Sequence, residues 1–235
     1  MPDPIPFDQP MPPVVIDPPE GKADSAFIFL HGLGDEGSSY QNLADQIHKA
    51  GRLPTTRFIF PSADFNKDAG ERAWYIPVPV QDSDPQGDLS SYEPAIDIAD
   101  SLIKEQEQSG IPRSRIVLGG FSQGSAVTAL WSITRQKTTS DKIAGLALVA
   151  GYVPMRAKFD NLIQDANRDH IKDQPMVVVH GQDDTLIQPW VMQEGVPILE
   201  KAGFDLSWAL LPEMRHNVTG QCIAGLCKFL EDMFR

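Results

Sequence analysis

The chain has 235 residues, which suits one large domain with a substantial core. Its 20 basic and 32 acidic residues give a formal net charge of −12, which disfavours nucleic acids and anionic membranes as partners. No apolar run reaches transmembrane length, and residues 1–16 lack the basic and apolar regions of a signal peptide. We therefore expect a cytoplasmic protein without stable membrane insertion and without a nucleic-acid partner.

The first half of the chain alternates short apolar runs with helical patterns. Residues 1–13 are rich in proline and predict an extended arm that precedes a single domain over residues 14–235. Beyond the arm, apolar runs predict strands at 14–16, 26–30 and 57–60, and helical spacing predicts helices through 43–47 and 92–103.

The second half continues this alternation up to a closing helix. Apolar runs predict strands at 115–120, 145–151, 175–181 and 204–211, and helical patterns cover 126–133, 189–203 and 219–234. Within the second of these helices, Gly195 and Pro197 are expected to cause an interruption. Cys222 and Cys227 lie five apart on the closing helix, which points them in different directions and predicts neither a disulfide nor a metal site.

Continuous apolar strands between helices are typical of an α/β fold whose mostly parallel sheet is flanked by helices on both faces. The exception is the stretch 61–89, which is rich in Pro, Asp and Ser and predicts a long functional loop. Only a short stretch separates Gly151 from Pro175, so no large cap domain is expected over the sheet.

The pentapeptide 120–124, G-F-S-Q-G, follows a predicted strand directly and precedes a predicted helix. A strand that turns at once into a helix strains the corner residue and needs small neighbours where the two elements pass closely. Gly120 and Gly124 provide that clearance, and the helix N-terminus points free N–H groups at whatever binds near Ser122. A glycine-rich loop without function is the alternative, but the position favours Ser122 as a nucleophile.

A serine nucleophile needs a base, and the base needs a third group that orients it. In folds with such a strand-to-helix corner the chain order is Ser, then Asp or Glu, then His. Among the five histidines, only His216 lies between the last predicted strand and the last predicted helix. Asp183 and Asp184 follow the strand 175–181, and spacing alone does not choose between them as the orienting carboxylate.

Acyl transfer also needs N–H donors for the oxyanion that forms on the attacked carbonyl, each worth about 3 kcal/mol. The amide of Gln123, directly after the serine, is one expected donor. The other is expected in the turn His31–Asp35, where Leu33 would donate and the flanking glycines would permit the bend. An ordinary strand-to-helix turn without a role is the alternative for these residues.

Four motifs follow or end predicted strands: LHGLGD (30–35), GGFSQG (119–124), HGQDDTLI (180–187) and MRH (214–216). Together they resemble the acyl-protein thioesterase family of α/β hydrolases, also called the phospholipase/carboxylesterase family. The resemblance extends over roughly residues 20–235 and implies the α/β-hydrolase fold.

The resemblance also assigns roles to individual residues. It implies Ser122 as the nucleophile and His216 as the base, and it supports Leu33 and Gln123 as oxyanion donors. In the family's motif HG-x-x-D-x-L the catalytic aspartate stands two residues before the leucine, which here implies Asp184. It implies no metal and no cofactor.

The family hydrolyses acyl thioesters or esters, so the resemblance implies an acylated protein, a lipid or a small ester as the partner. An acyl-protein thioesterase that removes palmitoyl groups is the main hypothesis, as a monomer or weak homodimer. A carboxylesterase or lysophospholipase is the alternative, and a ligand-binding relative without turnover is a third. Dienelactone-hydrolase-like chemistry is disfavoured, because it needs a cysteine where Ser122 stands.

The chain departs from the family's pattern near the expected site. The long loop has W-Y-I at 74–76 in place of W-F-D, and three further family residues, two glycines and a proline, are replaced by Ser125, Glu213 and Thr185. The loop change lies where the acyl or leaving group would bind. Trp74 and Tyr75, together with Leu186, are therefore the expected substrate contacts.

Overall fold

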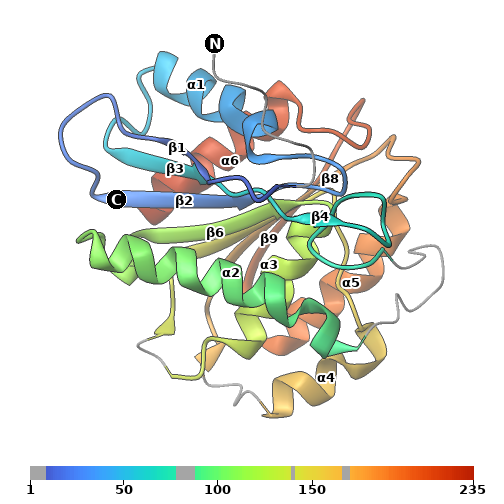
Figure 1. Cartoon of the computed structure of the whole chain (residues 1–235). Coiled ribbons are helices and arrows are strands. Elements are labelled where there is room, and N and C mark those ends of the chain that lie inside the picture. Colours follow the sequence, from blue (N-terminus) through green and yellow to red (C-terminus); the bar gives the residue numbers. More distant parts are fainter. Residues whose placement is uncertain (1–8, 78–87, 139–140, 166–169) are drawn as a thin grey trace.

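The computed structural model describes residues 9–77, 88–138, 141–165 and 170–235 and confirms the expected α/β class (Figure 1). A 7-stranded sheet has the order β1-β3-β2-β6-β7-β8-β9. β1 (Val14–Ile16) runs antiparallel to β3 (Thr56–Phe60), and every other neighbouring pair is parallel. The remaining strands of this sheet are β2 (Ser25–Leu30), β6 (Ile116–Phe121), β7 (Gly145–Val149), β8 (Pro175–Gly181) and β9 (Asp205–Leu211).

Helices cover both faces of the sheet, as predicted. α1 (Gln41–Lys49) and α6 (Gly220–Met233) lie on the face drawn uppermost in Figure 1. The opposite face carries α2 (Leu89–Gln108), α3 (Gln123–Thr134), α4 (Arg156–Asp165) and α5 (Pro189–Ala202). Short 3-10 helices at Gly37–Tyr40 and Arg113–Arg115 precede α1 and β6. In the described part of the chain α4 is the only helix between β7 and β8, so no large cap covers the sheet.

Strand β2 shows how the sequence divides the core between the two faces. Phe27 and Phe29 pack in the cluster that contains α1 and α6, whereas Ala26, Ile28 and Leu30 belong to the cluster that contains α2, α3 and α5. All five side chains are fully buried. Because successive side chains of a strand point to opposite faces, a strand covered on both sides must be apolar throughout.

The predicted interruption at Gly195 and Pro197 is wrong, because α5 runs continuously from Pro189 to Ala202. Pro197 removes one backbone donor, and the packing of the helix on the sheet outweighs that loss. Gly195 instead permits a close approach. A Cβ at this position would lie 2.7 Å from Cγ2 of Val153, in the segment that follows β7.

The stretch predicted as a loop between residues 61 and 89 contains a small hairpin. Its strands, β4 (Phe65–Asn66) and β5 (Glu71–Arg72), pair antiparallel. The division into an arm over 1–13 and one domain over 14–235 remains a prediction. Predicted features that lie outside the described residues are 78–87 of the long loop and 1–8 of the arm.

Candidate active site

Four loops meet at the carboxyl edge of the sheet, where β2, β6, β8 and β9 end. Parallel strands all end at the same edge, and open α/β sheets bind their ligands there. The loops carry, in chain order, Leu33, Ser122, Asp184 and His216. The fold therefore brings together residues that are far apart in the sequence.

Ser122 occupies the corner between β6 and α3. Its backbone has φ 52° and ψ −114°, in the left-handed region that non-glycine residues rarely adopt. Such a conformation costs on the order of 1–3 kcal/mol and persists only where its surroundings hold it. Here the Ser122 amide donates to the carbonyl of Val149 at 2.8 Å, which fixes the corner against β7.

The glycines around Ser122 provide the predicted clearance. A Cβ at Gly120 would overlap the backbone of Gly124 and lie 2.7 Å from the amide nitrogen of Ser125. A Cβ at Gly124 would overlap the carbonyl oxygen of Leu30 in β2 and lie 2.6 Å from its carbonyl carbon. Only glycine allows β6, α3 and β2 to approach so closely.

Ser122, His216 and Asp184 form a hydrogen-bonded series. Oγ of Ser122 lies 3.0 Å from Nε2 of His216, and Nδ1 of the same ring lies 2.7 Å from Oδ2 of Asp184. The Asp184 side chain is fully buried, and Ser122 is 8% exposed. An ionised Asp184 accepts the Nδ1 proton, which leaves the Nε2 lone pair to accept the hydroxyl proton of Ser122.

The two neighbouring aspartates, between which spacing alone did not choose, differ in their environment. Asp183 is exposed. Asp184 turns inward, where Oδ1 accepts hydrogen bonds from the amides of Leu186 and Ile187 at 2.9 Å each. These bonds hold the carboxylate so that Oδ2 faces His216, and they point to Asp184 as its partner, in agreement with the family resemblance.

The loops that carry Asp184 and His216 pack against each other. The amide of Asp183 donates to the carbonyl of Met214 at 3.0 Å, and a Cβ at Gly181 would overlap that same carbonyl. Glu213, where the family has glycine, has φ 59°. A left-handed conformation costs a non-glycine residue roughly 1–2 kcal/mol. Glutamate in place of glycine therefore adds strain to this loop.

The backbone amides of Leu33 and Gln123, the predicted oxyanion donors, belong to residues that line one cavity with Ser122. Within the described part of the chain, neither the amide of Leu33 nor that of Gln123 donates a hydrogen bond to another residue. The amide of Gly34, next to Leu33, donates to the carbonyl of Arg72 at 2.9 Å, and this hydrogen bond fixes the turn. Both predicted donors therefore remain available for a ligand.

The side chain of Gln123 connects the serine corner to the long loop, a role that sequence patterns did not reveal. Its Oε1 accepts from the amide of Trp74 at 2.8 Å, and its Nε2 donates to the carbonyl of Tyr75 at 2.9 Å. The indole of Trp74 donates to the carbonyl of His31 at 2.8 Å. One network thus joins the two turns that carry the free amides.

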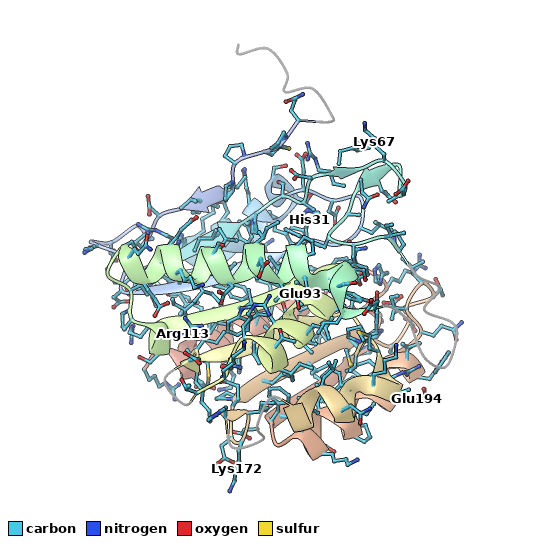
Figure 2. All side chains as sticks on the ribbon, turned by 60° about the horizontal axis from the view of Figure 1, so that its bottom comes forward. His31, Lys67, Glu93, Arg113, Lys172 and Glu194 are labelled. Carbon is cyan, nitrogen blue, oxygen red and sulfur yellow. The ribbon has the colours of Figure 1, made fainter. Side chains whose placement is uncertain are left out.

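His31 and His180 are both fully buried and were predicted only as parts of strand-end turns. Nε2 of His31 accepts from the amide of Ala63 at 2.8 Å, and this histidine is fully buried, whereas Lys67 lies at the periphery of the molecule in Figure 2. Nε2 of His180 lies 2.8 Å from the carbonyl of Ile187 and 3.5 Å from Oδ2 of Asp184. Burial lowers the pKa of both rings below the ordinary value, so both are neutral at physiological pH.

Acidification is expected to destabilise the protein through these two rings. In the folded state their pKa lies below the ordinary 6.5, so between the two values the unfolded chain binds more protons. The free energy of unfolding contributed by neutral His31 and His180 is thus fully present above about pH 6.5 and is lost as the pH falls toward the folded pKa. Thermal unfolding at a series of pH values measures this, and His180→Gln should flatten the slope. A midpoint that is independent of pH between about 7.5 and 5 would contradict it.

An apolar cavity of about 320 Å³ opens beside Ser122. Its wall includes Leu33, Leu186, Ile187, Pro77 and Tyr152. Leu186, a predicted substrate contact, lies in the wall and is 57% exposed. Tyr152 was not predicted, because only the folded chain brings it to the site.

The other two predicted substrate contacts lie behind this wall. Trp74 and Tyr75 are 5% and 3% exposed and do not line the apolar cavity. The hydroxyl of Tyr75 is hydrogen-bonded to that of Tyr152, so Tyr75 supports a residue that does line the cavity. The next residue, Ile76, is exposed at 52%.

Two further findings concern metals and membranes. Among the residues that the structure describes, no group of three or more His, Cys, Asp or Glu side chains could hold a metal ion. Within the same ranges, no helix is long and apolar enough to cross a membrane. Cys222 and Cys227 are both buried and unpaired.

Comparison with known proteins places this architecture in a family. The phospholipase/carboxylesterase family model matches residues 11–234. The chain is 34% identical over 181 residues to acyl-protein thioesterase 1 of Yarrowia lipolytica, covering 75% of this chain and 76% of that one. It is 31% identical over 196 residues to the protein of the same name from Cryptococcus neoformans, covering 80% and 78%. The crystal structure of Zea mays acyl-protein thioesterase 2 has the same fold, with a TM-score of 0.81, 20% identity and coverage of 95% and 99%. The chain therefore belongs to the phospholipase/carboxylesterase family of α/β hydrolases.

Proposed function

We propose that this hydrolase cleaves acyl thioesters or esters with Ser122 as nucleophile, His216 as general base and acid, and Asp184 as the orienting carboxylate. The observation that carries the proposal is the hydrogen-bonded series from Ser122 Oγ through His216 to Asp184, at 3.0 and 2.7 Å. Each member has the surroundings that its role requires. The serine is strained at a corner, and the carboxylate is buried and held by two amides.

The reaction proceeds in two halves. Oγ of Ser122 adds to the acyl carbonyl carbon while its proton passes to Nε2 of His216. The bond from that carbon to the leaving sulfur or oxygen then breaks, and the leaving thiol or alcohol takes the proton from Nε2. Water adds to the acyl-serine in the second half, giving a proton to Nε2. That proton returns to Ser122 when the carboxylic acid leaves.

The oxyanion of both tetrahedral intermediates would accept hydrogen bonds from the amides of Leu33 and Gln123. Their N–H groups have no partner within the described residues, and Gln123 stands at the N-terminus of α3, where the helix dipole favours negative charge. Each such donor is worth about 3 kcal/mol of barrier.

Acylated proteins are the proposed substrates, with a carboxylesterase or lysophospholipase activity as the alternative. The relatives that match most of the chain are named acyl-protein thioesterases, and the apolar cavity beside Ser122 suits an acyl chain. Among the described residues no large cap covers this cavity, so a bulky protein could bring its acyl group to it. The two unpaired cysteines are consistent with a reducing compartment such as the cytoplasm. A ligand-binding role without turnover has less support, because the complete series of nucleophile, base and carboxylate would have no use.

Labelling with a fluorophosphonate probe is expected to modify the wild-type protein and not the Ser122→Ala variant, because the probe reacts with an activated serine. Ser125→Ala is the matched control, since this neighbouring serine is buried and its hydroxyl has no hydrogen-bond partner. Labelling should survive that change. An unlabelled wild type, or a labelled Ser122→Ala variant, contradicts the proposed nucleophile. A chain-length series of thioesters and oxyesters then separates a depalmitoylating enzyme from a short-chain esterase.

A further inference from the structure

A second cavity of about 290 Å³ shares part of its wall, including His216, with the apolar cavity. We call it the polar cavity, because Ser39, Asn42 and Asn217 contribute to its wall. Asp35, Phe121 and His216 line both cavities, whereas Ser122 lines only the apolar one. The two cavities therefore adjoin at these three residues, one of which is His216.

The chemistry of acyl transfer assigns a different part of the substrate to each of the two cavities. The acyl group must lie at Ser122, and its carbonyl oxygen must face the amides of Leu33 and Gln123, all of which line the apolar cavity or its rim. The leaving atom must reach Nε2 of His216, from which it takes a proton. Whatever is attached to that atom must lie near His216, and the polar cavity is the cavity that His216 lines and Ser122 does not.

The electrostatics of the polar cavity is set by one carboxylate. No Lys or Arg from the described residues lines either cavity, and Asp35 makes no ion pair within that part of the chain. Oδ2 of Asp35 accepts a hydrogen bond from the hydroxyl of Tyr40 at 2.9 Å, which holds the carboxylate without neutralising it. Half-buried charges act more strongly than charges in open water.

Two further carboxylates near Asp35 add to the negative potential, and one arginine partly offsets it. Glu36 follows it in the chain, and the carboxylate of Glu71 lies against the backbone of Gly34. Arg72 is buried and donates to the carbonyls of Ala63 and Gln9, behind the turn. A cation placed in the polar cavity would thus gain a favourable interaction, and an anion would be repelled.

We propose that the polar cavity is the leaving-group site and that Asp35 makes it select peptide segments with basic residues beside the acylated residue. The inference rests on the proposed thioesterase or esterase function and adds a substrate class to it. The hydroxyl and amide groups of Ser39, Asn42 and Asn217 can pair with peptide N–H and C=O groups. A lipid headgroup with a net negative charge fits less well, because it would bring an anion next to Asp35, and none of the described lining residues is a cation that could receive it.

Three thioester peptides with the same S-octanoyl cysteine test the inference, with lysine, glutamine or glutamate on both sides of the cysteine. For the wild-type protein at low salt, kcat/KM is expected to be about tenfold higher for the lysine peptide than for the glutamate peptide, and the ratio should shrink as salt is added. The glutamine peptide serves as the neutral reference. Its hydrolysis by wild type, and not by Ser122→Ala, reports on the proposed function alone.

Matched variants separate Asp35 from the overall negative charge of the protein. Asp35→Asn keeps an acceptor for Tyr40 and should reduce the lysine-to-glutamate ratio to about twofold. Glu36→Gln removes the same charge one residue away, lines neither cavity and should leave the ratio near its wild-type value. Asn42→Lys, at an exposed position in the wall, leaves Asp35 intact and should favour the glutamate peptide.

The outcomes distinguish the two proposals. Equal ratios in wild type, Asp35→Asn and Asn42→Lys, with the glutamine peptide still hydrolysed, would overturn the inference and leave the proposed function standing. Equal losses in Asp35→Asn and Glu36→Gln would assign the selectivity to overall charge and also overturn it. Lysophosphatidylcholine hydrolysed faster than the lysine peptide would identify a lipid leaving group instead. Failure to hydrolyse any of these probes would count against the proposed function itself.

Discussion

Replacing Asp184 with asparagine is expected to lower kcat by about 10⁴-fold while the protein stays folded. Oδ1 of Asp184 accepts two amide hydrogen bonds, from Leu186 and Ile187. The asparagine oxygen would take that position, so its NH₂ group would face Nδ1 of His216. The ring would then carry its proton on Nε2, facing Ser122, and could not accept the hydroxyl proton. Steady-state hydrolysis of an octanoyl thioester measures the effect.

Asp183→Asn is the matched control for this prediction. The two residues are adjacent and the change in charge is identical, but Asp183 is exposed and is joined to the His216 loop only through its backbone amide. Its replacement should change kcat by less than about threefold. Similar losses in both variants would show that charge near the site matters rather than the orientation of His216. A fully active Asp184→Asn variant would remove Asp184 from the mechanism.

Gly124→Ala is expected to destabilise the fold by more than about 4 kcal/mol. Its Cβ would overlap the carbonyl oxygen of Leu30 and lie 2.7 Å from the Leu30 Cβ, so α3 could not keep its place against β2. Neither obstacle can move cheaply, since β2 is a central strand with buried side chains on both faces. Urea unfolding followed by circular dichroism measures the loss, and low soluble yield would be the same result in extreme form.

Gly225→Ala is the control, because this glycine also lies inside a helix but a Cβ there would have nothing within 4 Å. Alanine is the better helix former, so this change should stabilise the protein by up to about 1 kcal/mol. Opposite signs for the two substitutions are thus expected from the same chemical change. A Gly124→Ala variant as stable as wild type would mean that β2 and α3 can separate without cost, which contradicts the close approach.

The fold could be predicted from the sequence because its signals are local and repeated. Apolar strands such as β6 and β8 lie close to their predicted bounds. Gly120 and Gly124, within one pentapeptide, indicate that two elements pass closely there. The prediction of an interruption at Gly195 and Pro197 was wrong because it depended on local propensity alone. Propensity is a weak local preference, and the packing of α5 on the sheet overrides it.

The candidate site could be predicted only where a residue follows directly from its strand. Ser122 was predicted in this way, and His216 was predicted because it alone among the five histidines lies between the last strand and the last helix. The choice between Asp183 and Asp184 required the family resemblance, because the two differ only in which side chain turns inward. Burial of Trp74 and the contribution of Tyr152 depend on contacts between distant segments, and no spacing in the chain encodes them.

The hydrogen bonds of the Gln123 side chain have an evolutionary consequence, because both go to main-chain atoms of residues 74 and 75. Any sequence that keeps the path of this segment keeps the support of the serine corner. The exposed neighbour Ile76 can therefore diverge between relatives without a compensating change at Gln123. Mutation can in this way change the surface next to Pro77, which lines the apolar cavity, while the turn that carries Ser122 is inherited unchanged.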